Sequence, residues 1–352
     1  MPVNNLLTMP HSRDEDREKA SALPGHIDAL VEHLRLLVPQ AIRDGQVESI
    51  HQARVTTRRL KAAMDLLGPV LDAEHVKHHR RRFEKTLRKL RRRLGPLRDL
   101  DVMGGHLKEL PKTAPRRDAI EWLQGRLQSA RESSAHEALD DAPPTTVLSK
   151  LGAWWGLRDD IVEACEAADE LLAQSVHEQL DDFASESARL VSPAASSDGN
   201  GHPVDPHAIR IAGKSLRYTL EMAIAAGHAI PSDVMKSFKK MQEALGLWHD
   251  YVVLTERMLA MSSEAQLAHH DIPMQQNILG LSQLTLRRAE QHLNRFAELW
   301  KARGETMSAS IRSIFALSRD VAATSPQTDL GPGGSAGTAS ASTDPTAAGP
   351  TA

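Results

Sequence analysis

The apolar residues of the chain recur mainly at the spacing of an α-helix. Phe83, Leu87, Leu90 and Leu94 follow one another at steps of four, three and four residues, so they share one helix face. We find no convincing run of alternating apolar and polar residues, the pattern of a half-buried strand. Aromatic residues make up only 3% of a sequence rich in Ala, Leu, Glu and Arg. We therefore predict an all-α protein of roughly ten helices.

Both ends of the chain and one internal segment lack this periodicity. Residues 1–22 and the Ala/Ser/Gly/Thr/Pro-rich residues 321–352 offer too few apolar positions for a core, so we expect them to be disordered. Residues 192–206 form a Ser/Pro/Gly-rich insert that we expect to be flexible, and DDAPPTT at 140–146 indicates a boundary. One helical domain is thus expected between residues 23 and 320.

An internal repeat divides this domain into two units, at about residues 25–140 and 148–303. HQARVTTRRLKAAMD at 51–65 aligns without a gap with HAIRIAGKSLRYTLE at 207–221. Besides the leading histidine, six positions agree in charge class or shape. The flexible insert then lies inside the second unit.

Two further blocks repeat in the same order after a shift of five residues. The apolar stripe that starts at Phe83 corresponds to one that starts at Val234, and LGPLRD at 94–99 corresponds to LGLWHD at 245–250. The glycines of these motifs suit the position after a helix end, where positive φ costs glycine little. Their aspartates, Asp99 and Asp250, suit the N-cap of a following helix.

Positive charge is concentrated in one part of a chain whose net charge is −3. Residues 51–101 contain 15 Lys and Arg against six Asp and Glu, a local charge of +9, so the rest of the chain sums to −12. A basic region within an acidic protein favours a focused anion site over general adhesion to nucleic acid or membrane.

The basic residues of the repeated helix share one face. At about 100° per residue, His51, Arg54, Arg58 and Lys61 fall within an arc of roughly 80°, and the equivalent residues 207–217 do the same. A single basic face is most often a solvated surface, but here both units keep it and acidic partners at i±4 are scarce. We therefore expect the two faces to converge on a shared cleft and to meet an external anion.

Arginine and lysine together suit phosphate, since arginine presents a planar fork of donors and lysine a compact charge. A histidine at the head of each face adds a donor that a bound polyanion would keep charged, although a lone helical histidine is more often structural. Tyr218 either donates a hydrogen bond or packs. The candidate anion-binding residues are His51, Arg54, Arg58, Arg59, Lys61, Arg81, Lys85, Arg88, Lys89, Arg92, His207, Arg210, Lys214, Arg217, Tyr218, Lys236, Lys239 and Lys240.

These motifs resemble the CHAD family, the "conserved histidine α-helical domain". The matching pieces are HxxRVxxRRLK at 51–61, LGxxRDxDV at 94–102, HxxRIxxKxLRY at 207–218 and LGxxxD at 245–250. The resemblance covers about residues 25–303. It implies a pseudo-symmetric pair of helical bundles whose basic residues line a central groove or pore that binds inorganic polyphosphate. It also implies association with polyphosphate granules in a bacterial cytoplasm.

The second unit departs from the first at several positions. Ser215 stands opposite Arg59, Glu243 stands opposite Arg92, and Trp248–His249 stands opposite Leu97–Arg98, so we expect the second half of the site to be weaker. The ExExK signature that some relatives carry in a triphosphate-hydrolysing domain is not found in this sequence. We expect a non-enzymatic protein without a cofactor or a bound metal.

Three other functions fit parts of the sequence. His249–Asp250 and the pair Asp99 and Asp101 could belong to a metal-dependent phosphohydrolase. His51 or His207 could be the phosphoacceptor of a phosphorelay. The basic face could bind nucleic acid, although no aromatic stacking platform accompanies it.

The remaining sequence signals concern location. The N-terminus has no apolar core of a signal peptide, and no stretch approaches the roughly 20 apolar residues of a membrane span. Cys165 is the only cysteine, which fits a reducing cytosol. We therefore expect a cytoplasmic protein without a membrane partner, and the sequence leaves its oligomeric state open.

Overall fold

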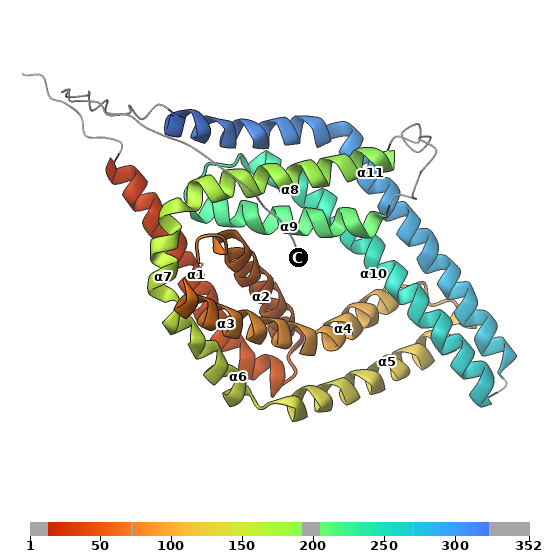
Figure 1. Cartoon of the computed structure of the whole chain (residues 1–352). Coiled ribbons are helices and arrows are strands. Elements are labelled where there is room, and N and C mark those ends of the chain that lie inside the picture. The colour runs from red at the N-terminus through yellow and green to blue at the C-terminus, as the bar shows by residue number, and fades with distance from the viewer. Residues whose placement is uncertain (1–12, 72, 192–204, 270, 324–352) are drawn as a thin grey trace, which may run out of the picture.

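The computed structural model of the chain consists of helices joined by short connections (Figure 1). It describes residues 13–71, 73–191, 205–269 and 271–323, and no strand occurs in these ranges. The predicted all-α class is therefore confirmed.

The helices of the first half are long and follow one another closely. They are α1 (Arg13–Ile42), α2 (Val47–Leu67), α3 (Glu74–Arg93), α4 (Gly95–Lys108) and α5 (Ala114–Asp141). The second half starts with shorter elements and ends with the longest helices. These are α6 (Pro144–Leu151), the 3₁₀ turn η1 (Gly152–Gly156), α7 (Arg158–Ala164), the 3₁₀ turn η2 (Cys165–Ala167), α8 (Ala168–Val191), α9 (Pro206–Ala225), α10 (Ser232–His269) and α11 (Ile272–Ala323).

Local sequence explains several helix ends. Gly45 adopts a φ of 61° in the turn between α1 and α2, and Gly227 adopts a φ of 96° after α9. Asp205 caps α9, because its side chain accepts a hydrogen bond of 2.9 Å from the backbone N–H of His207. Pro143 lies between α5 and α6, and Pro144 is the first residue of α6, where its missing N–H costs no helix hydrogen bond.

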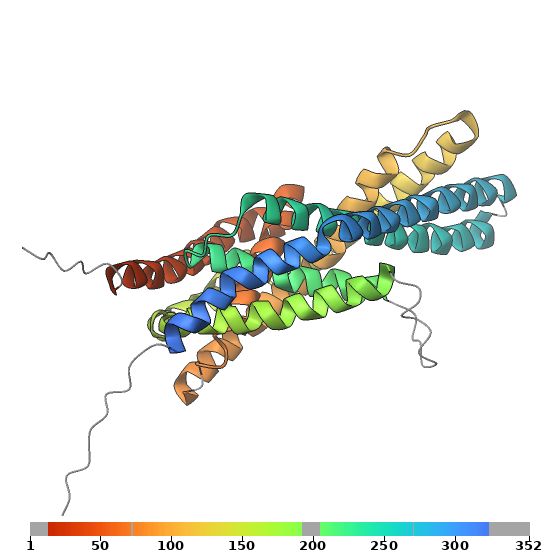
Figure 2. The same ribbon diagram turned by 90° about the horizontal axis from the view of Figure 1, so that it is seen from above.

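The helices form two connected groups (Figure 1). Helices α1 to α3 lie beside the short α6 and α7, with α8, α9 and the end of α11 packed alongside. At the opposite end, α4 and α5 contact the C-terminal part of α10 and the N-terminal part of α11, as the view from above also shows (Figure 2).

Each group encloses its own hydrophobic core, and both cores draw on both halves of the sequence. The larger core includes Phe83 of α3 and Phe183 of α8, while the smaller one includes Leu107 of α4 and Leu254 of α10. The predicted repeats therefore do not each enclose a separate core. Burial of these residues joins the two halves into one body.

Four expectations at the level of the backbone require correction. Gly95 is the first residue of α4 and Gly246 lies inside the continuous α10, so neither ends a helix in the left-handed region. Asp99 and Asp250 consequently lie in helix interiors and cap nothing. The reason is that α3 and α4 are separated only by Leu94, while α10 is not interrupted at the equivalent position.

The expected disordered and flexible segments fall largely outside the described residues. Helix α1 already begins at Arg13, which corrects the expectation for part of residues 1–22, and residues 1–12 lie outside. Of the insert, Asp205 and Pro206 belong to the start of α9, and residues 192–204 lie outside. Of the tail, α11 includes residues up to Ala323, and residues 324–352 lie outside.

Candidate anion-binding site

Helices α2 and α9 pack against each other and bring together basic residues that are more than 150 positions apart in sequence. Burial, followed by repulsion from Arg210 and Arg58, lowers the pKa of Lys214 to about 7. Burial also lowers the pKa of Arg210, and the charge of Arg58 adds to this effect. Arg54 and Arg58 of α2 therefore share one electrostatic environment with Arg210 and Lys214 of α9. These four residues are called the central cluster below.

Arg54 is the most firmly held member of the central cluster. Its Nη1 donates a hydrogen bond of 3.0 Å to the backbone oxygen of Arg91, and its Nη2 lies 3.9 Å from a carboxylate oxygen of Asp99. A Cβ atom at Gly95 would lie only 3.0 Å from Nη1 of Arg54. The glycine of the LGPLRD motif thus makes room for a guanidinium group, a role different from the one we expected.

The other three cluster residues have no carboxylate partner. In the described parts of the chain, no Asp or Glu oxygen lies within 4 Å of the charged groups of Arg58, Arg210 or Lys214. The Nε atom of Arg210 is also buried without a hydrogen-bond partner. Unpaired, half-buried cations are costly, so the arrangement favours an anion that the chain itself does not supply.

Two aspartates lie near the central cluster without neutralising it. Burial raises the pKa of Asp99, and the neighbouring Asp250 raises it further against the opposing effect of Arg54. Two carboxylates that repel each other beside four cations leave a net positive charge. Asp99 and Asp250 lie where α4 and α10 pass from the larger core to the smaller one, between Leu97 and Leu100 and between Leu245 and Tyr251.

Three further basic residues belong to this environment, although our candidate set does not contain them. Arg91 of α3 has a pKa lowered by burial and by repulsion from Arg58. Arg98 of α4 contributes to the lowered pKa of His51, after burial. His249 of α10 has a pKa lowered to about 4 by burial and then by Arg210. Arg98 and His249 occupy the same position in the two LG motifs, a sequence signal that could have identified them.

Both predicted histidines lie beside the central cluster, as does the tyrosine. Burial lowers the pKa of His51, and the charges of Arg98, Arg58 and Arg54 lower it further. The ring of His207 lies 5.2 Å from the ring of His249. Tyr218 influences the pKa of Arg91 and of Arg210, so it faces the cluster from α9.

Part of each basic face is neutralised by the chain itself. Glu221 of α9 accepts a hydrogen bond of 2.7 Å from Nε of Arg59 and another of 2.9 Å from Nε of Arg217. Lys61 is paired with Asp65, one turn away on α2. Arg59 therefore joins α2 to α9, whereas Arg217 pairs within α9, and both charges are neutralised by Glu221.

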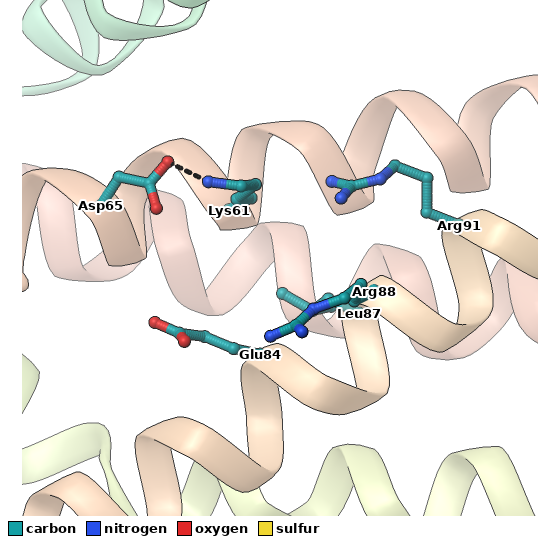
Figure 3. Close-up of a pocket in the computed structure, with 6 residues that line it drawn as sticks. All are labelled: Lys61, Asp65, Glu84, Leu87, Arg88 and Arg91. Atoms are coloured by element: carbon teal, nitrogen blue, oxygen red, sulfur yellow. Dashed lines mark hydrogen bonds and ion pairs between the residues drawn. The ribbon is translucent and has the colours of Figure 1, made fainter.

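A pocket of about 200 Å³ adjoins the central cluster through Arg91 (Figure 3). The Lys61–Asp65 pair of α2 lies on one side, and Arg88 and Arg91 of α3 lie across from it. Glu84 and Leu87 complete the lining. The pocket extends the basic surface from α2 onto α3.

The remaining candidates are not linked to the central cluster by any contact in the described residues. Lys89 lines a separate hollow together with Arg93 and Lys150. Lys239 faces Glu243 on its own helix at 3.9 Å. The others are exposed side chains of α3 and α10, namely Arg81, Lys85, Arg92, Lys236 and Lys240.

The chain belongs to the CHAD domain family, whose sequence pattern matches residues 25–259. Two curated relatives from Mycobacterium tuberculosis are each 26% identical over 251 residues. They are uncharacterized protein MT2285 of strain CDC 1551 and uncharacterized protein Rv2226 of strain H37Rv. The matched region covers 67% of this chain but 45% of theirs, so the chain spans about half the length of these relatives.

Two solved structures share the fold. The CHAD domain from the plant Ricinus communis aligns with a TM-score of 0.53 at 22% identity, covering 84% of this chain and 91% of the plant domain. PptA from Streptomyces chartreusis aligns with a TM-score of 0.52 at 18% identity, covering 81% of this chain and 99% of PptA. At these identities the likeness establishes the helical arrangement.

The described residues contain neither a helix that could span a membrane nor a group of metal-binding side chains. None of their helices combines the length and the apolar character that a membrane span requires. Among the same residues, no three His, Cys, Asp or Glu side chains are grouped so that they could hold a metal ion.

Proposed function

We propose that the chain binds inorganic polyphosphate at the central cluster without catalysing a reaction. The observation that carries the proposal is the set of half-buried charges on Arg58, Arg210 and Lys214 that have no carboxylate within 4 Å in the described residues. A polyphosphate would supply the missing negative charge, and guanidinium groups can each hold two phosphate oxygens. The resemblance to the CHAD family supports the same ligand.

The extent of the basic surface favours a linear polyanion over a single phosphate. Polar side chains continue from His207 and His249 to the central cluster, and positive charge continues from the cluster to Arg91 and to the pocket that contains Arg88. A flexible chain with about one charge per phosphate would meet these groups in turn. Through such binding the protein would associate with polyphosphate granules in the cytoplasm or serve in their regulation.

Titration of the full chain with polyphosphates of defined length tests this proposal. We expect polyphosphate to bind at least about 100-fold more tightly than single phosphate or ATP, because several contacts act together. The logarithm of the affinity is expected to fall with the logarithm of salt concentration by about 0.7 for each phosphate neutralised. Equal affinity for single phosphate and polyphosphate would contradict the proposal.

The same titration distinguishes two alternative functions. RNA of equal charge, added at the same salt concentration, should displace polyphosphate if the site is a nucleic-acid interface. Release of phosphate after addition of Mg²⁺, Mn²⁺ or Fe²⁺ would indicate a phosphohydrolase. The latter would need a cation to bind at Asp250, whose neighbours include Arg210 and Lys214.

Polyphosphate affinity is expected to decrease as pH rises above about 7. Lys214, whose pKa is lowered to about 7, faces Arg54 and Arg58 of α2, Arg210 of α9 and Asp250 of α10. Below pH 7 its ammonium group is already charged and supports binding; above pH 7 binding must first take up a proton. Linkage then predicts a loss of affinity of about tenfold between pH 7 and 8.5.

Calorimetry at several pH values would measure this effect, and the Lys214→Arg variant is the matched control. Arginine keeps its charge throughout this range, so the variant should bind with little dependence on pH. A similar pH dependence in both proteins would show that another group is responsible.

A further inference from the structure

Lys214 differs chemically from the exposed lysines of the chain. Its side chain is half-buried on α9, and no ion pair in the described part of the chain holds its ammonium group. Lys214 follows Arg210 by one helical turn on α9, and α9 packs against α2, which carries Arg58. Burial and these two cations lower the pKa of Lys214 to about 7, so a large fraction is a neutral amine at physiological pH. A lysine made neutral by burial and cationic neighbours is a nucleophile, as in lysine-dependent enzymes.

The neighbours of Lys214 determine which electrophile this amine would meet. Arg58, Arg210 and Arg54 all act on Lys214, and the first two have no carboxylate partner in the described residues. Their guanidinium groups suit a phosphate group. An electrophile that carries a phosphate next to a reactive carbonyl would therefore be held with its carbonyl carbon beside the amine.

We propose that Lys214 is a site of N-acylation by small acyl phosphates. The amine nitrogen attacks the carbonyl carbon and forms a C–N bond. The bond between that carbon and the bridging oxygen breaks, and inorganic phosphate leaves with the electron pair. The nitrogen releases one proton to solvent, so the products are an amide and phosphate without any redox change.

Acylation would regulate the polyphosphate site, and this consequence rests on the proposed function. The amide cannot take up a proton, so the modified Lys214 can no longer become charged when polyphosphate binds, and the central cluster keeps three cations. Modified protein should bind polyphosphate more weakly, and bound polyphosphate should protect Lys214 from acylation. The reaction would thus couple polyphosphate binding to the supply of activated carboxylic acids.

Acetyl phosphate is the probe for this proposal. The full chain is incubated with it at pH 7.5, and acetylation of each lysine is followed by peptide mass spectrometry. Lys236, Lys239 and Lys240 are exposed and serve as references within the same molecule. We expect Lys214 to react at least about tenfold faster than these three, because far more of it is unprotonated.

A second acetyl donor, an N-hydroxysuccinimide ester, contains no phosphate for the arginines to bind. Its rate therefore reports the reactivity of the amine alone, whereas the rate with acetyl phosphate also includes binding of the phosphate by the arginines. The Arg58→Gln variant should lose rate with acetyl phosphate relative to the ester, whereas Arg117→Gln, at an exposed position on α5, should not. Circular dichroism verifies that both variants are folded. The proposal is overturned if Lys214 reacts no faster than the exposed lysines with acetyl phosphate, or if Arg58→Gln leaves the donor preference unchanged.

The unmodified protein distinguishes failure of this proposal from failure of the proposed function. Selective acetylation without polyphosphate binding would refute polyphosphate as ligand and leave Lys214 as a modification site. Tight polyphosphate binding without selective acetylation would refute the modification site alone.

Discussion

Replacing Arg58 and Lys214 with glutamate is expected to abolish polyphosphate binding. The two residues lie on different helices but in one electrostatic environment, and the double substitution changes the local charge by −4. Two carboxylates would then repel the polyanion and also pair with the neighbouring Arg54 and Arg210. We expect the affinity to fall by at least about 1000-fold at low salt, as measured by the same titration.

A control with the same change in net charge tests whether position matters. Arg117 of α5 and Lys301 of α11 are exposed, and the Arg117→Glu, Lys301→Glu variant should keep most of the affinity. Thermal unfolding monitored by circular dichroism verifies that both variants are folded. Equal binding by the wild type and the Arg58/Lys214 variant would exclude the central cluster as the site.

Truncation of Phe183 to alanine is expected to lower the free energy of unfolding by about 3–5 kcal/mol. Phe183 of α8 is fully buried, and its ring centroid lies 5.4 Å from Phe238 of α10 and 5.4 Å from Trp300 of α11. Both neighbours meet it in an edge-on arrangement that adds to the stabilisation by burial. The substitution leaves a cavity at the centre of the larger core.

Urea unfolding followed by circular dichroism measures this loss. Phe183→Leu fills most of the same volume, so it should destabilise the protein much less than alanine does. If alanine and leucine have the same small effect, the contacts between α8, α10 and α11 contribute less than this geometry indicates.

The four residues of the central cluster could be chosen from the sequence, because the spacing of residues along a helix determines the face on which they lie. Arg54 and Arg58 had to share a face of α2, and Arg210 and Lys214 had to share a face of α9. The alignment of the two segments indicated that both faces serve one purpose. Their convergence follows from packing of α2 against α9, which the structure shows.

Other parts of the site depend on packing that local sequence does not encode. Glu221 pairs with Arg217 as Asp65 pairs with Lys61, in agreement with the alignment of the two segments, but it also pairs with Arg59, 162 residues away. Arg98 was treated as a point of difference between the units, although the start of α4 directs it towards His51. The sequence predicts a positive φ at Gly95, but the structure shows that the absence of a Cβ atom there leaves space for the side chain of Arg54.

Four unbroken helices connect the two cores. They are α4, α5, α10 and α11, each of which contributes residues to both cores. Because these helices are continuous, they resist a hinge motion that would separate the two cores. Movement of the two cores therefore cannot relieve the repulsion among the cations of the central cluster, and the proposed binding of an anion would lose little energy to closing the molecule around it.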